Sequence, residues 1–115
     1  MHYTQREKLP HWENWEKLHE KVGRTVETPL GQERIVMIRG LWDALDWFED
    51  RGFKPKALFK HCYDVHPELD LAYAMNWLLN TIFVERERQG LPNPRWIIAA
   101  ELPPGMELFY RPPGL

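Results

Sequence analysis

Residues 69–90, LDLAYAMNWLLNTIFVERERQG, decide the fold of this chain. Apolar residues lie almost all round a helical wheel drawn over residues 69–84, which is typical of a buried central helix. Pro67 suits the first turn of such a helix and Gly90 suits its C-terminal stop. The sequence therefore predicts that the longest helix of the protein forms the centre of its core. The residues expected to be mostly buried are Leu69, Leu71, Met75, Leu78, Ile82 and Phe83.

Asn76 and Asn80 interrupt this apolar helix, and their spacing of four residues places them on one face. A buried amide without a hydrogen-bond partner costs a few kcal/mol, so each should find one. Two interpretations follow. The amides bond to neighbouring backbone in the core, or they form polar contacts at a helix–helix seam between two subunits.

Two strands, residues 24–28 and 32–39, precede this region and turn at Pro29-Leu30-Gly31. This arrangement is typical of a β-hairpin. Residues 34–38 are apolar on both faces of the second strand, which predicts cover on both sides. A second hairpin is expected from residues 95–102 and 106–111, with its turn at Pro103-Pro104-Gly105.

Three further helices are expected, over residues 10–22, 41–51 and 55–63. Gly23 and Gly52 stand where the first two should end. The predicted order is α-ββ-ααα-ββ, in one α+β domain that spans residues 1–115.

Composition narrows the classes of function. The 115 residues include no serine and only four threonines, which excludes Ser-based nucleophiles and the Ser-type phosphate loop. The single cysteine excludes an intrachain disulfide framework and favours a reducing, cytoplasmic setting. No apolar run approaches the ~20 residues of a membrane span, so we expect no membrane partner. Ten prolines and many charged residues resemble a thermophile-like composition.

Candidate chemistry is confined to residues 61–66, where His61, Cys62, Asp64 and His66 could ligate a metal or pair for catalysis. A closed zinc site needs four ligands with suitable spacing, and Cys62 falls on the apolar side of its predicted helix. We therefore expect a core cysteine, with no catalytic residue, no metal site and no cofactor.

Residues 34–88 contain a strand at 34–39, a helix with Leu41-Trp42-Asp43-Ala44-Leu45, then Gly52 and a second helix with Ala57-Leu58. This order resembles the ribbon-helix-helix family of dimeric DNA-binding regulators. The resemblance implies a homodimer whose paired strands enter the major groove. Arg34 and Arg39 at the strand ends would then contact DNA. Lys54, Lys56 and Lys60 form a basic cluster near a helix N-terminus, where anions are favoured. The same cluster can also be read as a solvated surface.

Trp12 and Trp15 lie on the predicted first helix, at the edge of the domain. Tryptophan is enriched at hot spots of protein interfaces, so these two indoles are the expected partner-binding residues. The other interpretation is that both indoles dock the helix on its own domain. The sequence also predicts four tryptophans of the central elements in the core: Trp42, Trp47, Trp77 and Trp96. The leading expectation is a small, non-catalytic regulatory or inhibitory protein that contacts a protein partner. A dimeric ribbon-helix-helix-like transcription regulator is the alternative.

Overall fold

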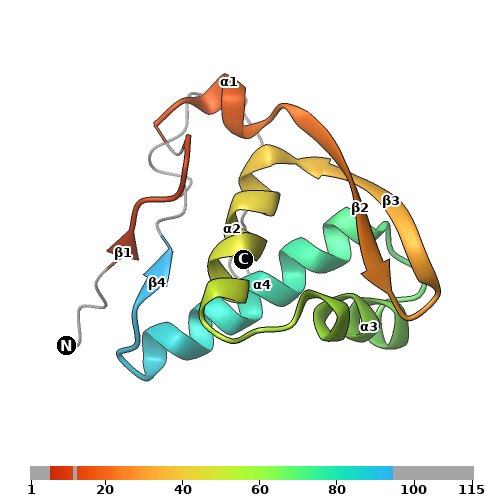
Figure 1. Ribbon diagram of the computed structural model, residues 1–115. Helices are drawn as coiled ribbons and strands as arrows, with labels where there is room; N and C mark the ends of the chain where they lie inside the picture. Colours follow the sequence, from red (N-terminus) through yellow and green to blue (C-terminus); the bar gives the residue numbers. More distant parts are fainter. Residues whose placement is uncertain (1–5, 12, 95–115) are drawn as a thin grey trace.

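The computed structural model describes residues 6–11 and 13–94, without the side chains of Arg6 and Trp15. This part of the chain is an α+β fold in which helices pack against a two-stranded antiparallel sheet (Figure 1). The elements in order are β1 (Arg6–Glu7), α1 (Trp15–Leu18), β2 (Lys21–Thr28), β3 (Gly31–Ile38), α2 (Arg39–Asp50), α3 (Pro55–Val65), α4 (Leu71–Arg88) and β4 (Asn93–Pro94).

The β2–β3 hairpin forms where the sequence predicts it, with paired residues running from Thr28↔Gly31 to Lys21↔Ile38. Gly31 has φ 105°, a conformation that glycine adopts without strain. The Thr28 hydroxyl accepts a hydrogen bond from the Leu30 N–H at 3.1 Å. It also lies 2.6 Å from Glu33 Oε2, to which it can donate. Local turn chemistry therefore fixes the register of the hairpin.

The predicted first helix, residues 10–22, is wrong. Helix α1 is a single turn, and Asn14 caps it by accepting a hydrogen bond from the Lys17 N–H at 3.1 Å. Val22 and Gly23 belong to β2, because pairing with β3 continues as far as Lys21. A ladder of backbone hydrogen bonds and a β-branched valine thus override the helical pattern.

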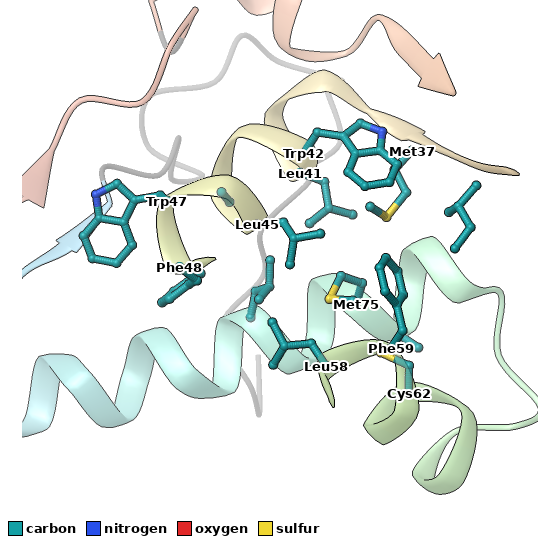
Figure 2. Packing of buried hydrophobic residues seen from close by; sticks show 14 of the residues in the cluster. Met37, Leu41, Trp42, Leu45, Trp47, Phe48, Leu58, Phe59, Cys62 and Met75 are labelled. Atoms are coloured by element: carbon teal, nitrogen blue, oxygen red, sulfur yellow. The ribbon is translucent and has the colours of Figure 1, made fainter. Parts of the chain in front are cut away.

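Buried side chains from β3 and three helices meet in one core (Figure 2). Helix α2 is amphipathic and turns one wide face inward. The Trp42 indole N–H donates to the Val22 carbonyl at 2.8 Å, which joins α2 to β2. The core includes Ile35 and Met37 of β3, Leu41, Trp42, Leu45, Trp47 and Phe48 of α2, Leu58, Phe59 and Cys62 of α3, and Ala74, Met75, Leu79 and Phe83 of α4.

Helix α4 is long, as predicted, but it is not buried all round. Of the six residues expected to be mostly buried, Met75 and Phe83 are buried. The other four, Leu69, Leu71, Leu78 and Ile82, are only partly buried. Among the described elements, α2, α3 and β4 contact α4. They cover one face of the helix and leave Tyr73 and Trp77 exposed.

Strand β3 is also covered on one face only. Ile35 and Met37 are buried, whereas Val36 on the opposite face is 50% exposed. The expectation of cover on both sides of this strand is wrong: α2 and α3 contact the hairpin, and Val36 stays exposed on its outer face (Figure 1).

Strands β1 and β4 pair in parallel, with Arg6↔Asn93 and Glu7↔Pro94, and bring distant parts of the chain together. The Trp47 indole N–H donates to Glu7 at 2.9 Å, and Arg51 pairs with the same carboxylate. The Asn93 amide donates to the Phe83 carbonyl and to Glu87, each at 3.0 Å. The predicted second hairpin, residues 95–111, lies outside the described residues.

Candidate partner-binding surface on helix α4

The predicted anchors cannot be compared directly with the structure. Trp12 lies outside the described residues, and Trp15 is described only through its backbone, at the start of α1. Leu18 in the same turn is fully buried. Helix α1 therefore docks on its own domain at least through Leu18.

The predicted DNA-contacting cations lie on three elements, and carboxylates neutralise three of the five. Arg39 lies 3.4 Å from Glu20, and Lys56 lies 3.2 Å from Glu27. Lys60 pairs with Asp64 one helical turn away at 2.5 Å. Each carboxylate lowers the net positive charge around its cation, which weakens the local attraction for a phosphate.

Arg34 and Lys54 complete that set. Arg34 lies on the outer face of β3, with its guanidinium across Gly23, where an added Cβ would come within 2.5 Å. Lys54 is the exposed N-cap residue of α3.

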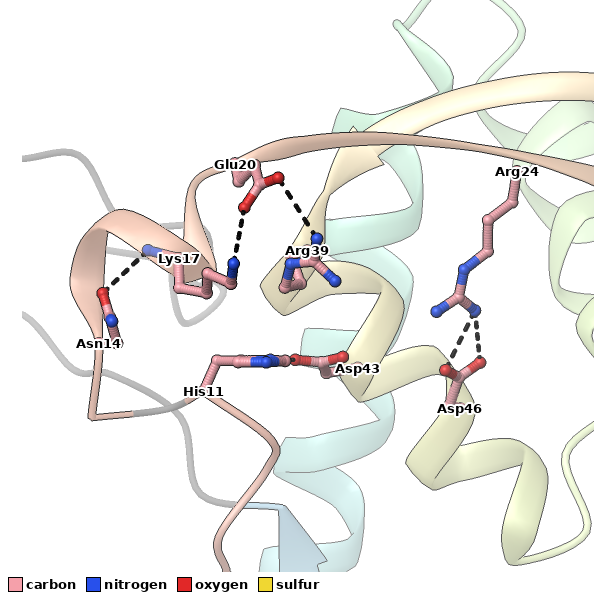
Figure 3. Close-up of polar contacts among 8 residues, drawn as sticks. All are labelled: His11, Asn14, Lys17, Glu20, Arg24, Arg39, Asp43 and Asp46. Atoms are coloured by element: carbon pink, nitrogen blue, oxygen red, sulfur yellow. Dashed lines mark hydrogen bonds and ion pairs between the residues drawn. The ribbon is translucent and has the colours of Figure 1, made fainter.

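Acidic and basic side chains form a network around the first turns of α2 (Figure 3). His11 Nδ1 lies 3.4 Å from a carboxylate oxygen of the buried Asp43. Burial raises the pKa of Asp43, and the hydrogen bond from His11 partly opposes that rise. His11 has φ 63°, a left-handed backbone that non-glycine residues rarely adopt. The pair can hold a proton, but no hydroxyl or thiol nucleophile of the described residues contacts it.

A cleft of about 430 Å³ opens between β2, α2 and the start of α3. Arg24 in its wall donates to both oxygens of Asp46, at 2.9 and 3.0 Å, and its guanidinium lies 4.9 Å from the Trp42 ring centre. Lys56 in the same wall is paired with Glu27. The cations of the cleft are thus already occupied, which leaves little charge to orient a ligand.

Cys62 is buried on the inner side of α3, as predicted, and burial raises its pKa to about 11. Among the described residues, no group of three or more His, Cys, Asp or Glu side chains is placed to hold a metal ion. None of the helices in the described part of the chain is long and apolar enough to cross a membrane.

The outer face of α4 carries a line of exposed side chains, which we call the α4 stripe. Trp77 points about 160° away from the buried Leu79 around the helix axis. Tyr73 and Trp77 are 51% and 38% exposed, and the Thr81 hydroxyl donates to the Trp77 carbonyl at 3.0 Å. The α4 stripe consists of Asp70, Tyr73, Trp77, Thr81 and Arg88.

The prediction that Trp77 lies in the core is wrong, because its side chain is exposed on the outer face of α4. Trp42 and Trp47, assigned to the core on the same argument, are buried; Trp96 is outside the described residues. The polar Thr81, one turn after Trp77, is the sequence signal that could have revealed an outer face. Asn80 is fully buried, which favours the core interpretation for that amide.

Comparisons with known proteins identify no relative. The chain matches no protein-family model, no curated protein and no solved structure. The fold and the surface therefore define the class of protein in structural terms: a small α+β domain with an exposed aromatic helix face.

Proposed function

We propose that this chain is a non-catalytic protein-binding domain that acts as a small regulator or inhibitor, and that the α4 stripe is its contact surface. One observation carries the proposal. Tyr73 and Trp77, 51% and 38% exposed, are the two most exposed of the tyrosine, tryptophan and phenylalanine side chains that the structure describes, and they are neighbours on one helix face. Trp and Tyr dominate the binding energy of protein interfaces because they bury large area with few rotatable bonds.

The polar groups support a binding role over a catalytic one. The Cys62 thiol is buried and its raised pKa disfavours the reactive thiolate. Of the carboxylates that line the cleft, Asp46 and Glu27 are engaged with Arg24 and Lys56. The described surface groups therefore favour binding of a partner over catalysis.

The test uses the full chain as bait for interacting proteins, further copies of itself included. Tyr73→Ala with Trp77→Ala should weaken the captured interaction by more than ~2 kcal/mol, the usual threshold for hot spots. Leu30→Ala is the matched control, because Leu30 is 73% exposed at the hairpin turn and lies outside the α4 stripe. Unchanged binding by the double variant, measured by calorimetry, would contradict the proposal.

Trp12 and Trp15 remain the competing location for the same function. If they are the anchors, Trp12→Ala with Trp15→Ala weakens partner binding by more than ~2 kcal/mol. The Tyr73 and Trp77 variants would then bind normally. Circular dichroism should show that the domain stays folded in both cases.

The DNA-binding alternative makes a different prediction. Binding to arbitrary duplex DNA would fall steeply with salt concentration, because phosphate contacts release counterions. It would depend on Arg34, Arg39, Lys54 and Lys56, and Trp77→Ala would leave it unchanged.

A further inference from the structure

The α4 stripe has opposite charges at its two ends. Asp70 precedes the first turn of α4 and Arg88 is its last residue. Both residues are exposed. Their separation corresponds to about five helical turns, so the two side chains lie on the same side of the helix, in line with Trp77.

Asp70 occupies the N-cap position of α4, but its side chain makes no capping hydrogen bond. Aspartate at this position usually accepts one from the backbone two or three residues on. No ion pair of Asp70 with another described residue is present either, so its carboxylate is open to a cation from outside. Arg88 pairs with Glu85 at 3.1 Å, and both side chains are largely exposed. Exposed pairs of this kind contribute little, so Arg88 can change partner at small cost.

We propose that the partner of the α4 stripe is the α4 stripe of a second copy of this chain, packed antiparallel about a two-fold axis. The inference rests on the proposed function, because it names the occupant of the same surface. A two-fold interface must be complementary to itself. Asp70 and Arg88 are equally far from Leu79 along α4, and so are Trp77 and Thr81. An axis opposite Leu79 therefore sets each Asp70 against the other copy's Arg88, and each large Trp77 ring against the small Thr81.

Antiparallel packing also brings the positive N-terminal end of each helix dipole beside the negative C-terminal end of the other. The contact area sets the expected strength. Helix α4 has 18 residues and is about 27 Å long, with a face about 10 Å wide. Such a face covers about 270 Å² on each copy, or about 540 Å² over the two copies. That area is well below the ~1,200 Å² at the low end of stable, specific interfaces, so the dimer should be weak and concentration-dependent.

Sedimentation equilibrium of the full chain tests the inference, over concentrations from ~1 μM to ~1 mM. The average mass should rise from the 13.8 kDa of one chain toward twice that value. Asp70→Arg and Arg88→Asp should each weaken self-association at least ~10-fold, because each places two like-charged pairs in the dimer. Asp50→Arg, a reversal at an exposed carboxylate at the end of α2, should leave it unchanged.

Mixing the two stripe variants gives the decisive measurement. A chain with Asp70→Arg carries two cations on its stripe, and a chain with Arg88→Asp carries two anions. Neither variant should pair with itself, yet an equimolar mixture should associate. Circular dichroism checks that each variant is folded. If one reversal unfolds the chain, Asp70→Asn and Arg88→Gln replace the pair, and their mixture should associate more tightly than either alone.

A wild-type chain that stays monomeric at every concentration would overturn the inference, and so would a mixture that fails to associate. If Tyr73 and Trp77 are nevertheless needed for capture of a different protein, the proposed function stands and the partner is not a second copy. If those two substitutions alter neither self-association nor capture, the proposed function itself fails.

Discussion

The hydroxyl of Tyr63 donates a 2.7 Å hydrogen bond to the carboxylate of Glu33 and so ties α3 to the β2–β3 hairpin. Hydrogen bonds from Thr28 and then Tyr63 hold the pKa of Glu33 below its ordinary value. Burial, followed by the bond to Glu33, raises the pKa of Tyr63 to about 12. Tyr63 and Glu33 therefore stabilise the fold as a pair, in the state where the carboxylate is charged and the phenol is neutral.

Tyr63→Phe should destabilise the protein at neutral pH and move the pKa of Glu33 back toward its ordinary value. Because the folded pKa is depressed, this contribution is fully present above the unfolded value of 4.5 and is lost as pH falls through the folded pKa. Urea unfolding at pH 7 and at pH 3 should show the difference between variant and wild type shrinking in acid. Tyr73→Phe is the control, since Tyr73 is exposed on α4. A pH-independent difference would contradict the assignment.

Asp43→Asn should raise the thermal midpoint at pH 7. Burial raises the pKa of Asp43, so the folded state holds the proton more tightly than the unfolded chain does. Stability is then lost as pH rises from the ordinary value of 3.8 through the folded pKa, and a neutral amide removes that loss. Melting curves at pH 7 and at low pH should show the gain fading in acid. The control is Asp50→Asn, at an exposed carboxylate at the end of the same helix, which should bring no gain.

Leu79→Ala should destabilise the protein by about 2–5 kcal/mol, because Leu79 is fully buried and its removal leaves a cavity. Leu78→Ala should cost clearly less, since Leu78 is only partly buried. Denaturant unfolding of both variants, with equal slopes, measures the difference. Equal losses at the two positions would mean that the outer side of α4 is also packed in solution.

These two leucines show what the sequence can and cannot predict. The helix itself follows from local signals, and so do the hairpin turn at Thr28 and the inward position of Cys62. Which side of α4 faces the core depends on where α2 and α3 dock, and an apolar pattern all round the helix does not contain that information. The apolar pattern for this reason predicts a buried Trp77, whereas the residue lies on the candidate surface.

The prediction of the first helix is wrong for a different physical reason. Residues 10–22 have a helical apolar pattern, but Val22 pairs with Met37 in the hairpin. Pairing between distant residues is invisible to a local pattern. The β1–β4 pair was missed on the same grounds, because its two strands are only two residues long and come from distant parts of the sequence.

Cys62 should react slowly with thiol reagents in the native protein. The thiol is buried, and a pKa of about 11 leaves almost no thiolate at neutral pH. Labelling monitored by mass spectrometry should become rapid only in denaturant. Fast labelling of the folded chain at pH 7 would show that α3 opens or that the thiol is activated. Addition of zinc before labelling should not change the rate.

The parallel β1–β4 pair has a mechanical consequence. Tension that draws the start of β1 away from the end of β4 acts along the two strands in opposite directions, so it loads their hydrogen bonds together, in shear. The same tension reaches α2 through the bonds of Glu7 to Trp47 and Arg51. In pulling experiments, the first peak of force should therefore come from the β1–β4 pair. The helices of the core should bear load only after the two strands have separated.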